Sequence, residues 1–169
     1  NGFNIVKLGF SHDKATAEHS ALVIKALDKQ STDSAALLIE EFKQDLSLQL
    51  LGHFSSLPWQ LIAELFKGLP KSDLPSALNT RAERLLTGDI SLFQVQPLLW
   101  KMIWSTPISL NLLDEHTKFI LIRLVLQQTS VNSLIEEAGF TGKKDLDSQF
   151  KTAVQGWYAH YKSLQNNSY

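Results

Sequence analysis

The sequence contains no cysteine, a single methionine and only five prolines among its 169 residues. The absence of cysteine excludes disulfide bonds, zinc sites built on thiolates, iron–sulfur clusters and cysteine nucleophiles. No apolar run approaches the roughly 20 residues that are needed to cross a bilayer. The opening segment, NGFNIVKLGF, has neither an initiating Met nor the basic-then-apolar pattern of a signal peptide. We therefore expect a cytoplasmic chain that is a fragment, or whose start has been removed.

The sequence also lacks an excess of either charge. Charged residues make up 20% of the chain, and the formal net charge is only -1. Domains that bind nucleic acid without sequence preference are usually basic, so this balance weighs against that class. The 44% of hydrophobic residues is enough for a real core. We expect one all-helical domain over residues 1–169, and any boundary between subdomains should fall near residues 88–89.

Helical spacing dominates the rest of the chain, because apolar residues recur at three- and four-residue intervals. This pattern predicts helices at about residues 15–27, 31–54, 56–68, 73–88, 91–105, 110–127, 131–138 and 143–164. Ser31, Thr32 and Asp33 are candidate caps for the second helix, and Pro97 should kink or divide the fifth. Residues 1–10 alternate loosely, which indicates an extended arm or one short strand. Without a strand pair, the pattern predicts an all-α fold: a multi-helix bundle or a short helical-repeat array with a helix-turn-helix-like C-terminal part.

Catalytic and metal-binding motifs are missing. None of the five histidines stands in a metalloprotease spacing, and the sequence has no nucleophile elbow and no glycine-rich phosphate loop. Neighbouring acids such as Glu40 and Glu41 diverge on a helix, so they are solvated faces rather than an acid/base pair. We expect no enzyme activity, no cofactor and no metal.

Arg123 interrupts the apolar run FILIRLVL. One interpretation puts Arg123 at the exposed edge of a helix, where it shares a stripe with Gln127. The other puts it inside, as a structural salt bridge with an acid or as a binding arginine.

Tryptophans are the most notable apolar residues. Trp100 and Trp104 lie four residues apart and therefore on one face of a helix, with Met102 nearby. Such residues fill the core of a domain, but Trp and Met are also enriched in the centres of protein interfaces. The second interpretation predicts contacts with another protein through Trp59, Trp100, Met102 and Trp104.

The segment SVNSLIEEAGFTGKKDLDSQFK, residues 130–151, combines a short helix, a Gly-Phe turn and a second helix with two lysines at its start. It resembles the helix-turn-helix of AraC-type transcription regulators, through Ser130, Leu134, Gly139, Phe140, Thr141, Leu146, Phe150 and Lys151. The resemblance implies that the second helix enters the major groove of DNA. Lys143, Lys144, Ser148 and Lys151 would then contact phosphates or base edges, although Asp145 and Asp147 would also be carried toward the phosphates.

Residues 24–58 are similar to the helical repeats of the flagellar rotor switch protein and of the N-terminal domain of MgtE-type magnesium transporters. The matching positions are Leu27, Asp28, Ala35, Ala36, Leu38, Asp45, Leu46, Leu50, Leu51, Leu57 and Pro58. This similarity implies a curved helical stack that binds other proteins. The favoured function is thus a non-catalytic protein–protein interaction module, an adaptor or scaffold in a bacterial assembly. The alternative is a DNA-binding transcription regulator, and a small-molecule pocket within the bundle has no signature in the sequence.

Overall fold

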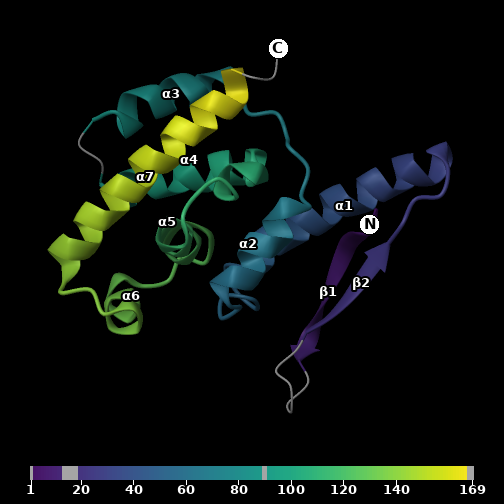
Figure 1. Ribbon diagram of the computed structural model, residues 1–169, viewed down its shortest axis with the longest axis horizontal. Helices are drawn as coiled ribbons and strands as arrows, with labels where there is room; N and C mark the ends of the chain where they lie inside the picture. Colours follow the sequence, from purple (N-terminus) through teal and green to yellow (C-terminus); the bar gives the residue numbers. More distant parts are fainter. Residues whose placement is uncertain (1, 13–18, 89–90, 167–169) are drawn as a thin grey trace.

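The computed structural model describes residues 2–12, 19–88 and 91–166, and it is mostly helical, which confirms the predicted all-α class. A two-stranded sheet precedes the helices along the chain (Figure 1). The elements are β1 (Asn4–His12), β2 (His19–Ile24), α1 (Lys29–Gln49), α2 (Trp59–Lys67), α3 (Ser76–Leu86), α4 (Leu92–Ser105), the 3-10 helix η1 (Pro107–Leu110), α5 (Glu115–Leu121), the π-helix η2 (Ile122–Leu126), α6 (Val131–Ala138) and α7 (Lys143–Asn166). Within the described residues, no helix combines the length and the apolar character that crossing a bilayer demands.

The hairpin corrects two predictions. A helix was expected over residues 15–27, of which 15–18 lie outside the described residues, and no strand pair was expected. Instead, β2 pairs antiparallel with β1, with Val23 opposite Ile5 and Leu22 opposite Lys7. Val23 and Ile24 are β-branched and favour extended backbone, and cross-strand pairing overrides the helical spacing of a few apolar residues. Strand β1 packs against α1. This contact supports the two-stranded sheet, whose stability would be marginal on its own.

Helix α1 begins earlier than the sequence predicted. Asp28, rather than a residue at 31–33, is its cap: the Asp28 carboxylate accepts from the backbone N–H of Ser31 at 2.7 Å. The Ser31 hydroxyl accepts in turn from the backbone N–H of Asp28 at 3.0 Å. This reciprocal pair is a capping box, so Ser31 is the third residue of the helix instead of its start.

Pro97 does not divide a helix, because α4 runs through it from Leu92 to Ser105, and a kink at Pro97 stays a prediction. Pro97 lies in the first half of α4. It has no backbone N–H, so the helix loses one hydrogen bond, the one to the carbonyl of Phe93 in the first turn. Leu99, Met102 and Ile103 follow it and are all fully buried. Their packing holds the helix together despite the missing hydrogen bond.

The most buried part of the chain is the one predicted at 110–127, but it is not one helix. Residues 107–110 form η1, α5 starts at Glu115, and the backbone widens into the π-helix η2. Asp114 caps α5, where its carboxylate accepts from the backbone N–H of Thr117 at 2.9 Å and from the Thr117 hydroxyl at 2.6 Å. Helix α7 packs across α5 and η1, and the indole N–H of Trp157 donates to the Ser109 hydroxyl at 2.9 Å.

The boundary expected near residues 88–89 stays a prediction, and Asp89 lies outside the described residues. On either side of that position, α3 and α4 contact each other, and α3 also contacts α7.

The Asp114 cap should carry a pH-dependent part of the stability. Replacing Asp114 with Ala removes the acceptor for Thr117 and should lower the free energy of unfolding by about 1 kcal/mol at pH 7. The hydrogen bonds from the side chain and backbone of Thr117 hold the pKa of Asp114 below its usual value. The carboxylate therefore adds stability above about pH 4, and this stability is lost as the pH falls through the lowered, folded-state pKa. Urea unfolding at a series of pH values measures both effects.

Asp114→Asn is the matched control, because the amide oxygen still caps the helix but does not titrate. It should keep most of the stability at pH 7 and lose less than the unmodified chain between pH 7 and pH 3. An identical loss in both proteins would contradict this role of Asp114.

Candidate functional site

The four residues predicted to contact a partner do not form one exposed aromatic face. Trp100, Met102 and Trp104 all lie on α4, and Trp59 is the first residue of α2. Met102 is 0% exposed and Trp104 is 6% exposed, so both are core residues. Trp104 is turned toward Phe66, with ring centroids 4.7 Å apart. The half-buried Trp59 and Trp100 keep surface, and their contact with a partner stays a prediction.

The predicted helix-turn-helix segment does form two helices joined by a tight turn. Ser130 caps α6, accepting from the backbone N–H of Ser133 at 3.1 Å. Gly139 ends α6 in the left-handed conformation at φ 70°, which glycine adopts without strain. The apolar residues shared with the AraC-type motif are buried in and around this unit: Leu134, Phe140, Leu146 and Phe150. Residues 130–151 thus form the helix, turn and helix that the sequence predicted, and DNA binding by them stays a prediction.

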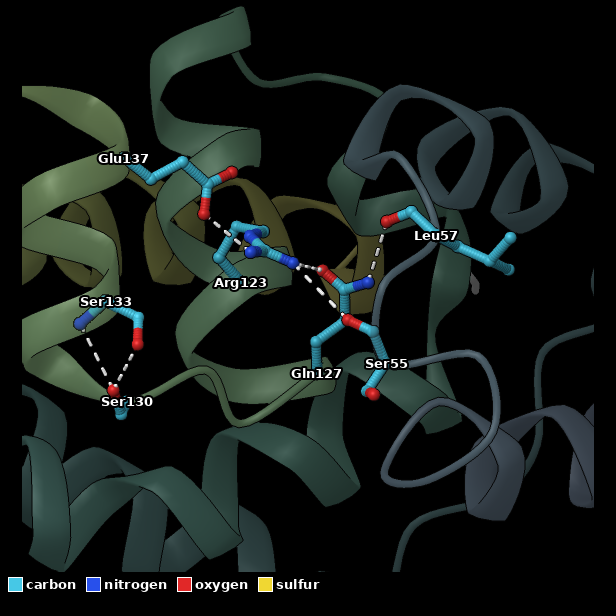
Figure 2. A network of polar contacts seen from close by, with 7 residues as sticks. All are labelled: Ser55, Leu57, Arg123, Gln127, Ser130, Ser133 and Glu137. Atoms are coloured by element: carbon cyan, nitrogen blue, oxygen red, sulfur yellow. Dashed lines mark hydrogen bonds and ion pairs between the residues drawn. The ribbon is translucent and has the colours of Figure 1, made fainter. Parts of the chain in front are cut away.

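A polar network fixes α6 against the rest of the molecule (Figure 2). The Arg123 guanidinium on η2 donates to Glu137 on α6 at 2.6 Å and to the Gln127 side chain at 2.8 Å. Gln127 is buried, and its amide N–H donates to the carbonyl of Leu57, before α2, at 2.8 Å. Arg123 therefore forms a structural ion pair with Glu137, as the second interpretation of the sequence proposed.

Three of the four predicted DNA contacts, Lys143, Lys144 and Ser148, are exposed at the start of α7. The fourth, Lys151, is partly exposed and lies 3.4 Å from the Asp147 carboxylate. Asp147 falls between Lys143 and Lys151 at four-residue spacing, so an acid interrupts the basic face. The result is a small cationic end of α7 rather than a continuous basic stripe.

Asp145 has a structural role beside that face. Its carboxylate accepts from the Gln149 side chain at 2.8 Å and from the backbone N–H of Thr141 at 3.0 Å. The hydrogen bond from Gln149, followed by that from Thr141, lowers the pKa of Asp145. Asp145 thus holds the turn between α6 and α7.

An apolar groove lies beside the cationic end of α7. Its volume is about 380 Å³, and its lining comes from α4, η2, α6 and α7: Ser91, Leu92, Phe93, Leu124, Val131, Lys143, Lys144, Leu146, Asp147 and Phe150. Phe93 is 80% exposed. A second hollow of about 400 Å³ adjoins it, and both share Leu92, Phe93, Leu124, Val131 and Lys143. The groove therefore combines an exposed aromatic ring with two exposed lysine side chains at one edge.

Sequence reasoning missed Phe93, although a signal exists. The residues three and four positions after it, Gln96 and Pro97, are not aliphatic. Phe93 therefore does not continue the apolar stripe that buries Val95, Leu99 and Met102, and an outward orientation follows.

Neither a metal-binding cluster nor a known relative points to a function for these surfaces. Among the described residues, no group of three or more His, Asp or Glu side chains is placed to hold a metal ion. Comparisons of the sequence with protein-family models and with curated proteins give no significant match.

Gln127 is the test of the network in Figure 2. Gln127→Leu leaves the buried carbonyl of Leu57 without its donor and Arg123 without one acceptor, and should cost about 2 kcal/mol of unfolding free energy. The backbone N–H groups of α6 should also exchange with solvent faster, because α6 loses part of its anchor. Urea unfolding and amide hydrogen exchange measure the two effects.

Gln94→Leu makes the same chemical change at an exposed position of α4 and should leave both measurements nearly unchanged. Equal effects of the two substitutions would show that the network does not anchor α6.

Proposed function

We propose that this chain is a non-catalytic protein–protein interaction module, an adaptor that binds its partner in the groove between α4 and α7. The observation that carries the proposal is Phe93, an aromatic side chain 80% exposed in an apolar groove. Aromatic residues are typical anchors of protein interfaces, and this exposed ring borders an apolar groove instead of standing alone on a polar surface.

The edge of the groove selects the chemistry of the partner. Lys143 and Lys144 are exposed there, and the one acid in the lining, Asp147, lies 3.4 Å from Lys151. An incoming acidic side chain therefore meets two ammonium groups without a competing partner among the groove's own acids. The partner that fits is an amphipathic helix whose apolar residues cover Phe93 and whose Asp or Glu residues approach the lysines.

DNA binding is the second candidate, supported by the exposed Lys143, Lys144 and Ser148 at the start of the second helix of a helix-turn-helix-like unit. Two features favour a protein partner instead. Asp147 sits within the lysine face, and it would be brought close to the DNA phosphates. Phe93 borders the same face, where a DNA backbone offers no apolar surface to cover it. A place in a bacterial assembly rests on the two family resemblances.

Peptide selection tests the proposed partner chemistry. A phage-displayed library of random amphipathic helices should yield peptides with apolar residues at helical spacing flanked by Asp or Glu. Phe93→Ser should weaken these peptides by at least about tenfold, the effect of losing a central aromatic anchor. Lys143→Glu with Lys144→Glu should weaken them further, and isothermal titration calorimetry measures each affinity. Because Phe93 is exposed, the substitution should leave the unfolding free energy nearly unchanged.

Leu48→Ser is the matched control, because Leu48 is an exposed apolar residue on α1, outside the groove lining. It should bind the selected peptides like the unmodified chain. Peptides that lack acids, or that bind the Phe93→Ser protein equally well, would overturn the proposal. The DNA alternative makes the opposite prediction: salt-dependent binding of a labelled duplex that Lys144→Ala reduces and Phe93→Ser does not change.

A further inference from the structure

A separate cleft lies at the other end of α4, apart from the groove at Phe93 and the hollow beside it. It is an open hollow of about 400 Å³ between α1, residues 72–78 and α4. The lining includes Leu74, Pro75 and Leu78 on the apolar side and Trp100 and Trp104 on the wall. Most of the exposed surface of the cleft is apolar, as is usual for small-molecule sites, although polar and charged side chains also line it.

Lys43, on α1, is the buried charged group of this cleft, which is also lined by Glu40, Asp73 and Lys101. Its side chain is buried, and its ammonium group donates to the carbonyl of Pro70 at 2.7 Å and to the Ser72 hydroxyl at 2.5 Å. The nearest carboxylate oxygen in an ion pair, that of Glu40, is 4.0 Å away and beyond hydrogen-bonding distance. Burial lowers the pKa of Lys43, and Glu40 offsets this only in part. The cation is therefore incompletely compensated, with one of its three hydrogens available for a further acceptor.

The two tryptophans of the wall also lack acceptors. The indole nitrogen atoms of Trp100 and Trp104 are buried, and neither has a hydrogen-bond partner within the described part of the chain. Buried donors are nearly always satisfied in proteins, so two unsatisfied donors in one wall call for an explanation. Trp100 is only half-buried, so a rotation of its ring can bring its N–H to an acceptor in the cleft.

We propose that this cleft binds a small carboxylic acid with an apolar group, the carboxylate facing Lys43 and the apolar group covering Leu74, Leu78 and Trp100. An acceptor in the cleft satisfies the remaining hydrogen of Lys43 and, once the Trp100 ring rotates, the indole N–H of Trp100, and a negative charge compensates the buried ammonium. Lys43 and Lys101 are balanced by Glu40 and Asp73 in the lining, so a monoanion is opposed less than a phosphate dianion. The proposal does not depend on the groove at Phe93.

Benzoate is the probe, and the indole N–H signals in two-dimensional ¹H–¹⁵N NMR spectra of the full chain are the readout. The sequence has four tryptophans, so each indole reports separately. The Trp100 signal should shift in a saturable way as its N–H gains an acceptor, and the Trp104 signal should shift with it, because the centroids of the two rings are 6.0 Å apart. Trp59 lies outside the cleft lining and Trp157 already donates to Ser109, so their signals should stay in place. Toluene, which has the ring without the carboxylate, should produce no saturable shift.

Lys43→Met keeps the length of the side chain and removes the charge, and should weaken benzoate binding by about tenfold or more. Lys67→Met, at an exposed lysine of α2, is the control and should bind benzoate normally. Absence of saturable shifts at Trp100 and Trp104 in the unmodified chain would overturn the proposal without any variant. Equal binding by the Lys43→Met protein would overturn the assignment of Lys43.

Discussion

The carbonyl oxygen of Leu57 is buried next to η2, and the amide of Gln127 is its donor. The arrangement of the C-terminal half depends on this bond, because Gln127 also holds Arg123, and Arg123 holds Glu137 on α6. One buried amide thus connects the segment before α2, the centre of the molecule and the first helix of the helix-turn-helix-like unit (Figure 2). A buried polar network restricts geometry more than apolar contacts do, because each member must find its partner at the right distance and angle.

The π-helix η2 extends this constraint to α4. The side chain of Gln96 donates to the carbonyl of Leu124 at 2.6 Å, which ties the first half of α4 to η2. Phe93 and α7 therefore line a groove whose α4 wall is tied to η2 directly and whose α7 wall is tied to it through α6. Such a groove is largely formed before a partner arrives, so binding there would lose little conformational entropy.

How much the sequence predicts depends on whether the determining contacts are local. The start of α7, the Ser130 cap and the Gly139 turn were predicted correctly, because neighbouring residues decide them. The hairpin was missed because pairing with β1 decides the fate of β2. Burial of Met102 and Trp104 could not be predicted either, since four-residue spacing shows that side chains share a face but not what lies opposite. The groove is lined by side chains from four elements, so local patterns could not predict it. Among its residues, only Phe93 carried a local signal of exposure.

Both proposed sites use α4, but physical distance argues that they act independently. Phe93 lies seven positions from Trp100 and eleven from Trp104, which corresponds to roughly 10 Å and 16 Å along a helix. Between them, Leu99, Met102 and Ile103 are fully buried and hold α4 in the core. Sites farther apart than about 10 Å without shared partners usually have additive energetics. Coupling between a carboxylate near Lys43 and a helix near Phe93 would therefore require α4 to move as a unit. Such a movement would strain the Gln96–Leu124 hydrogen bond and the core contacts together, so the two sites should be occupied without affecting each other.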